Sequence, residues 1–140
     1  MEPASEIRRA WLETEYRVRL RRGGYAVIRI SAPLPAPLHE FLRDERAPWG
    51  FITAWNPHAK KTSRERNRTA QRELLTALRG FGIEPRVGIG VGTGKYDWRE
   101  PSLFVTGLNF ETLDALAHRF GQAAIVRGIG FGIAQLHEPL

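Results

Sequence analysis

The sequence predicts an α/β protein of the α+β kind: a single mixed β-sheet packed by about four helices, with β-hairpins at the N- and C-terminal ends. Helical and strand patterns alternate along the 140 residues, and helices separated by one or two strands favour one mixed sheet over a purely parallel one. Glycine pairs divide alternating segments near both ends, as in hairpin turns. The apolar run 51–55 is typical of a central strand buried on both faces.

The first half of the chain begins with a helix and a hairpin. Ser5 can cap the helix, and Gly23-Gly24 fits the turn of the hairpin. A proline-rich connection then ends at Pro48 and Gly50. The expected elements are a helix over 5–15, strands over 16–20 and 25–30, a short helix over 38–45 and the strand 51–55.

The second half contains the clearest helix. Thr62 and Glu65 have the spacing of a capping box, and apolar residues recur behind them at helical spacing. Asn109 can cap the next helix, while Gly128 and Gly130 fit a terminal hairpin. The expected elements are these two helices, strands over 87–91 and 102–106 between them, and strands over 123–126 and 131–136 at the end.

Size and composition fit one domain spanning 1–140. A chain of this length can bury roughly two-thirds of the surface that its unfolded form exposes, so it needs no metal or disulfide for stability. The absence of cysteine excludes disulfides, thiolate metal sites and cysteine nucleophiles. Residues 1–10 are polar, and no apolar run is long enough to span a membrane, so the expected location is the cytoplasm.

The charge balance points to anionic partners. The net charge is +6, and nearly all of the 21 basic residues are arginines. Such an excess favours nucleic acid, nucleotides or acidic proteins. The alternative is an ordinary arginine-rich surface, because the charge is spread along the chain.

Spacing disfavours two kinds of ligand site. The segment from Gly88 to Lys95 resembles a phosphate loop, but Ile89 stands where the first glycine belongs. Tyr96 also stands where the magnesium-binding hydroxyl belongs, so a glycine-rich strand and turn explain the segment better. The four histidines lack metal-ligand spacing, so neither a metal nor a cofactor is predicted.

The end of the central strand is the most informative candidate site. Thr53, Trp55 and Asn56 are expected where the strand leaves the sheet, which is where ligands bind in open α/β sheets. Pro57 keeps Asn56 out of the helical region, so a short amide is fixed at that point. The alternative is that Asn56 only satisfies the backbone of its own loop.

Asn67 adds a second amide to this region. It lies in the first turn of the long helix, on the apolar face, where a polar side chain needs a partner. The loop after the central strand returns that turn to the strand end, so Asn56, His58 and Asn67 are expected to converge near a helix N-terminus that favours an anion. The alternative is that Asn67 only ties down the loop.

A further cluster comes from an extended segment later in the chain. Trp98, Glu100 and Ser102 alternate and so share one face, where an indole, a carboxylate and a hydroxyl can stack and orient a ligand. Glu100 is the best candidate general base and Ser102 the second candidate catalytic residue, although no histidine is spaced to complete a triad. Gln122, at the start of a later strand, can also point into a cleft. The alternative is that Glu100 pairs with an arginine and Trp98 belongs to the core.

The long helix also carries a basic stripe. Its members are Arg64, Arg68 and Arg72, spaced every four residues, and the neighbouring Lys60 and Lys61. This pattern can track the phosphates of a nucleic acid. The alternative is a solvated face balanced by Glu65 and Glu73, and this segment lacks the interleaved aromatic residues of a single-strand binder.

Several of these stretches occur together in a recognisable order. They are Phe51-Ile-Thr-Ala-Trp-Asn-Pro57, Asn67 at the head of a leucine-rich helix, Trp98-Arg-Glu-Pro-Ser102, and Phe120-Gly-Gln122 followed by Ala124-Ile-Val126. Over about residues 10–137 the chain resembles the bacterial family known as domain of unknown function 3293. The matching positions are Thr53, Trp55, Asn56, Asn67, Trp98, Glu100, Ser102 and Gln122.

That resemblance implies positions and no particular reaction. It also implies two departures, since the family pattern has a serine where Ala59 stands and an asparagine where Ala123 stands. This chain is therefore expected to lack one or two polar contacts.

Three functions fit these features. The leading hypothesis is a small domain that binds a small polar or anionic, nucleotide-like ligand at the strand ends, with an indole as a stacking wall. The second is a nucleic-acid or ribosome-associated protein that uses the basic stripe, and the third is a protein-interaction module. Catalysis and oligomeric state are left open.

Overall fold

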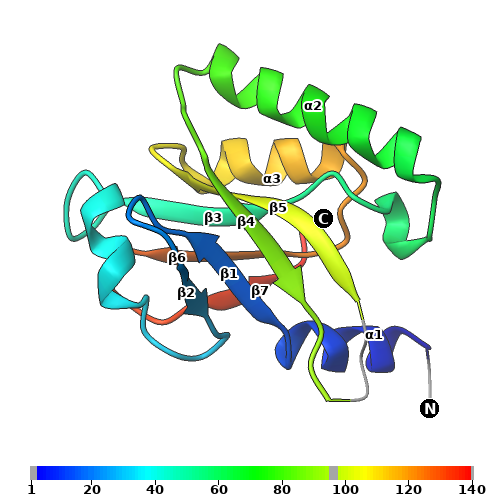
Figure 1. Ribbon diagram of the computed structural model, residues 1–140, viewed down its shortest axis with the longest axis horizontal. Helices are drawn as coiled ribbons and strands as arrows, with labels where there is room; N and C mark the ends of the chain where they lie inside the picture. The colour runs from blue at the N-terminus through cyan, green and yellow to red at the C-terminus, as the bar shows by residue number, and fades with distance from the viewer. Residues whose placement is uncertain (1–2, 95–97, 140) are drawn as a thin grey trace.

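The computed structural model describes residues 3–94 and 98–139, which form one seven-stranded sheet with helices against it (Figure 1). The strand order is β2-β1-β4-β5-β3-β6-β7. The strands are β1 (Glu15–Arg19), β2 (Tyr25–Ile28), β3 (Pro48–Ile52), β4 (Arg86–Val91), β5 (Arg99–Thr106), β6 (Ile125–Ile129) and β7 (Gln135–His137). The helices are α1 (Pro3–Leu12), α2 (Arg64–Gly80), α3 (Phe110–Arg119) and the short 3-10 helices η1 (Ala36–Phe41) and η2 (Pro57–Ala59).

The predicted fold class is confirmed. The terminal hairpins β1–β2 and β6–β7 are both present, and the ladders between the named strands are antiparallel. A parallel bridge joins Ile30 to Ala134, and an antiparallel bridge joins Pro33 to Ile133. These bridges bring the two edges of the sheet toward each other, so the sheet curls around its inner face.

The sheet separates two apolar cores. On the outer face, α2 and α3 lie side by side over β3, β5 and β6 (Figure 1). That core is built around the buried residues Ile52, Leu74, Leu78, Leu103, Val105 and Leu113. The inner core lies within the curl, where the segment containing η1 covers it, and its largest members are Tyr16, Trp49, Phe51 and Phe104.

Glycines on the inner face make room for the large rings of this core. A Cβ atom on Gly88 would lie 2.8 Å from Cε2 of Phe51 and equally close to a main-chain oxygen of β1. A Cβ atom on Gly128 would lie 2.6 Å from Cζ2 of Trp49, its partner across the β3–β6 ladder. The glycine-rich strand predicted over 87–91 is therefore β4, and its glycines are packing positions. Lys95 and Tyr96, which also entered the phosphate-loop comparison, lie outside the described residues.

The central strand is shifted toward the N-terminus from its predicted place. It runs from Pro48 to Ile52 between β5 and β6, so Pro48 and Gly50 belong to the strand and do not end the connection. Gly50 is required there because a Cβ atom would lie 3.0 Å from Cδ1 of Leu113 in α3. Close helix packing, which a sequence pattern does not display, explains a glycine that looked like a loop residue.

Helix ends follow local capping, with one correction. Asn109 caps α3 as predicted, since its side chain accepts a hydrogen bond from Thr112 N. The cap of α2 is Ser63, whose hydroxyl accepts from Arg66 N, so the predicted capping box at Thr62 is wrong by one residue. No helix within 3–94 and 98–139 is long and apolar enough to cross a membrane.

Candidate ligand cavity

After β3 the chain turns sharply away from the sheet. Asn56, His58 and Ala59 all have positive φ angles, of 47°, 61° and 57°. Pro57 denies Asn56 the right-handed helical region, and asparagine tolerates the left-handed one better than most residues do. The strand end is thus a strained loop, which must be held in place by its surroundings.

Asn67 holds this loop. Its Nδ2 donates to Oδ1 of Asn56 at 2.9 Å, and its Oδ1 accepts from Asn56 N at 2.8 Å. Oδ1 of Asn56 also accepts from Thr62 N at 3.1 Å. Asn67 is only 2% exposed. The two asparagines converge as expected, but Asn67 spends its amide on the loop, which is the structural alternative raised for it.

Two glutamines complete the frame around the strand end. Gln71, one turn beyond Asn67 on the same face of α2, accepts from Ala54 N at 2.9 Å. Gln122 donates from Nε2 to the carbonyl oxygen of Trp55 at 3.2 Å. The role of Gln71 was missed in the sequence, although an amide at helical spacing from Asn67 on an apolar face signals it. Thr53 donates its hydroxyl to the Pro101 carbonyl at 2.7 Å, which anchors the loop to β5.

Behind this frame, on the inner face of the curled sheet, lies a cavity of about 80 Å³. Its aromatic walls are Trp11, Tyr16, Phe51, Trp55 and Trp98. Its polar lining is Thr53, Asn56, Glu100, Ser102 and Gln122. The cavity therefore brings together six of the predicted ligand or catalytic residues from the strand end, β5 and the start of β6, together with Trp98. Asn67 and His58 do not line it, and His58 lies exposed on the surface.

The sequence rule that first pointed to the strand end does not apply here. That rule holds for open parallel sheets, in which strand ends of one kind meet at one edge. This sheet is antiparallel, and the cavity forms because Glu100 and Ser102 face inward on β5 beside the end of β3.

Glu100 sits in a row that crosses three strands. Gly90 of β4 pairs with Glu100 on one side and with Tyr16 on the other. Because Gly90 has no side chain, the Trp98 ring lies over it, and a Cβ atom there would be 3.3 Å from Cζ3 of that ring. The row thus leaves a carboxyl group between an indole and a phenol ring.

The environment of Glu100 changes its acidity. Burial raises the pKa of Glu100 to about 7. No Arg, Lys or His among the described residues lines the cavity, and Glu100 forms no ion pair within the described ranges. Burial also raises the pKa of the Tyr16 phenol, and the nearby charge of Glu100 adds to that shift. A lone carboxyl group with a neutral-range pKa can either donate or accept a proton.

Ser102 has a different role from Glu100. Its hydroxyl is 97% buried by residue and donates to the main-chain oxygen of Glu100 at 2.9 Å. No histidine among the described residues lines the cavity to take its proton. The geometry therefore supports Glu100 as the chemically active group and Ser102 as part of the strand's own packing.

The basic stripe lies elsewhere. Arg64, Arg68 and Arg72 line a groove of about 600 Å³ between α2 and the outer face of β4 and β5, which Arg99 also lines. Lys60 and Lys61 are exposed and do not line it. Trp55 lines both this groove and the cavity, so it separates the two.

Fold and cavity define an α/β protein with helices over one face of a curled antiparallel sheet and a small acidic cavity on the other. The chain belongs to the family described as "Protein of unknown function (DUF3293)", whose model matches residues 52–125. The match runs from the last residue of β3 to the first of β6 and includes most of the cavity's polar lining. Neither the curated proteins nor the solved structures contain a match to the chain.

Both positions at which this chain departs from the family pattern line the cavity. They are Ala59, in the strained loop, and Ala123, just before β6. A serine and an asparagine there would each add a polar group to the cavity wall. The expected loss of polar contacts therefore concerns the cavity itself.

Proposed function

We propose that the protein binds a small polar molecule in the cavity, and that Glu100 recognises this molecule and exchanges a proton with it. The observation that carries the proposal is a carboxyl group in an aromatic-walled cavity, with no cation to balance it among the described lining residues. Enclosing such a group costs stability. Carboxyl groups with displaced pKa values are concentrated at functional sites, where that cost has a purpose.

The chemistry of the lining favours a ligand that donates hydrogen bonds. Ionised Glu100 only accepts hydrogen bonds, so an amine, an amide N–H or a hydroxyl complements it. An anionic ligand would meet this carboxylate without a compensating cation from the described residues, so the anionic part of the sequence hypothesis has less support here than the polar part. The Trp55 and Trp98 rings suit a flat or cationic group.

The size of the cavity limits the ligand. Pockets for drug-sized molecules usually enclose roughly 300–1,000 Å³, well above the 80 Å³ found here. The cavity accordingly suits a small molecule, or one functional group of a larger molecule whose remainder stays outside. Near neutral pH, Glu100 can supply general acid–base chemistry to that group.

Nuclear magnetic resonance of the indole N–H groups tests this proposal. The probes are imidazole, acetamide and ethanolamine as donors, with acetate and phosphate as anions. We expect a donor probe to shift the Trp98 signal, and Glu100→Gln to weaken an amine probe about tenfold, because a charged hydrogen bond is lost. Glu111→Gln, which removes an exposed carboxylate of α3, is the matched control and leaves binding unchanged.

Two results contradict the proposal. One is that none of the three donors shifts Trp98. The other is that Glu100→Gln and Glu111→Gln bind every probe equally well.

A further inference from the structure

The arginines of α2 form a straight row along the outer groove. Arg64, Arg68 and Arg72 are four residues apart, so consecutive members are separated by about 6 Å along the helix axis. Arg99 reaches the same groove from β5. Neighbouring phosphates of an extended nucleic-acid strand have a similar separation, so the row can contact more than one phosphate at once.

The acidic residues of α2 lie on a different side. Glu65 and Glu73 line a separate shallow hollow with Arg66. None of the four groove arginines pairs with a carboxylate within the described parts of the chain. The alternative in which Glu65 and Glu73 balance the stripe is therefore not what the geometry favours, and the groove keeps its positive charge.

The groove has an apolar floor and an aromatic wall. Ile89, Pro101 and Trp55 line it, and Ile89 and Pro101 also line the neighbouring hollow over β1, β2 and β4. That hollow contains Tyr25, which is 53% exposed. No helix residue contributes to it. Aromatic side chains that the sequence of α2 lacks are thus supplied by the strand end after β3 and by β2.

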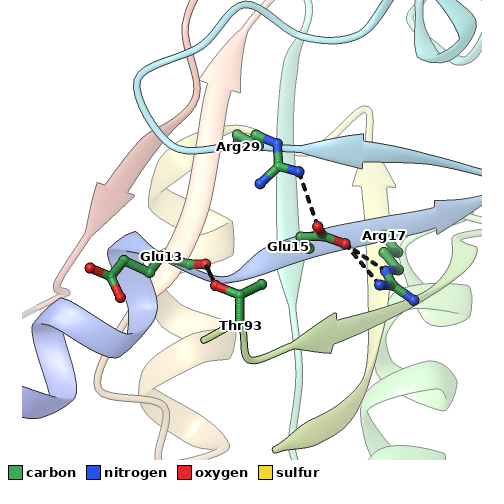
Figure 2. Close-up of polar contacts among 5 residues, drawn as sticks. All are labelled: Glu13, Glu15, Arg17, Arg29 and Thr93. Atoms are coloured by element: carbon green, nitrogen blue, oxygen red, sulfur yellow. Dashed lines mark hydrogen bonds and ion pairs between the residues drawn. The ribbon is translucent and has the colours of Figure 1, made fainter. Parts of the chain in front are cut away.

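The β1–β2 part of this surface holds one acidic residue among its arginines. Figure 2 shows Glu15 between Arg17 and Arg29, which it pairs with at 2.8 and 3.0 Å. The guanidinium of Arg17 also lies 4.8 Å from the centre of the Tyr25 ring. The positive charge is therefore partly neutralised at β1 and strongest along α2.

We propose that this outer surface, from the arginine row of α2 across to Tyr25, binds single-stranded nucleic acid. Phosphates would contact Arg64, Arg68 and Arg72, and unstacked bases would lie on the apolar floor and the exposed rings. Stacking on aromatic side chains requires bases that are free of a duplex. This surface is on the face of the sheet opposite the cavity, so the inference does not depend on the proposed function of Glu100.

Fluorescence anisotropy with labelled oligouridylate and oligothymidylate of about 12 nucleotides tests the proposal, since single-strand sites span roughly 4–16 nucleotides. Arg68→Gln is compared with Arg66→Gln, which removes the same charge from the same helix on its other side. We expect Arg68→Gln to weaken binding about tenfold and to reduce the salt slope by about 0.7. Arg66→Gln is expected to stay within about twofold, because its charge is distant and screened.

Three results would overturn the proposal. The first is no binding of either strand at low salt. The second is an equal loss in Arg66→Gln and Arg68→Gln, which would indicate unspecific attraction to the net charge. The third is equally good competition by uridine monophosphate at the same molar concentration, which would indicate a site for one phosphate. Circular dichroism melting of both variants checks that they remain folded.

Discussion

Asn56 and Asn67 exchange two hydrogen bonds, of 2.8 and 2.9 Å, that fix the end of the central strand against the first turn of α2. The pair turns a strained loop into a rigid wall of the cavity. Asn67 does this without lining the cavity itself. Its contribution is therefore to stability and to the position of Asn56.

Asn67→Ala is expected to destabilise the protein by about 1–3 kcal/mol, because it leaves the Asn56 N–H without its partner beside a buried helix face. The measurement is the free energy of unfolding in urea. Arg66→Ala, an exposed change one residue earlier, should alter it by less than about 0.5 kcal/mol. Equal effects of the two changes would remove the bracing role from Asn67.

Gly88→Ala should destabilise the fold by about 1–3 kcal/mol, since the added Cβ would overlap the Phe51 ring and a β1 carbonyl group. Gly80 is the control: no atom lies within 4 Å of a Cβ built there, and it ends α2 without a positive φ angle. Gly80→Ala should be neutral or stabilise by up to about 1 kcal/mol. Thermal denaturation distinguishes the two, and a neutral Gly88→Ala would contradict the inner-face packing.

The pKa of Glu100 implies a stability that falls as pH rises. Its pKa is about 7 when folded and near its ordinary 4.5 when unfolded. The folded state therefore holds the extra proton between these values, and stability is lost as pH rises from 4.5 to 7. The loss amounts to about 3 kcal/mol.

Glu100→Gln removes this titration and keeps the shape of the side chain. Its stability relative to the natural protein should be about 3 kcal/mol higher at pH 8.5 than at pH 4. Urea unfolding at the two pH values measures the difference. A difference that is the same at both pH values would show that the carboxyl group titrates normally.

The surface chemistry around Glu15 gives a test with the opposite sign. If the outer surface binds nucleic acid, Glu15→Gln should strengthen binding several-fold at low salt, because it releases Arg17 and Arg29 from their shared partner. Anisotropy titration measures the gain, with Glu13→Gln as the control beyond the start of β1. Unchanged or weaker binding in Glu15→Gln would restrict any nucleic-acid contact to α2.

The sequence was sufficient for the order of the elements and for the members of the cavity, and the reason is local. Alternation in Trp98, Glu100 and Ser102 shows which side chains share a face. A buried amide such as Asn67 signals a partner nearby. Both are properties of one segment, and both appear in the structure.

What the sequence did not reveal depends on contacts between segments. Gly50 looked like a loop residue because the approach of Leu113 is not visible in a linear pattern. The aromatic partners of the arginine row were missed because Trp55 and Tyr25 come from other elements. Strand order likewise follows from how the sheet curls, and no local pattern records it.

The most direct test of the account is the pKa of Glu100 itself. A carbon-13 titration of its side-chain carboxyl group, assigned by comparison with Glu100→Gln, should give a midpoint of about 7. That value would show a carboxyl group held in the cavity without a cation and able to exchange its proton near neutral pH. A midpoint near 4.5 would mean that the group is solvated or paired, and would contradict Glu100 as the ligand-recognising residue.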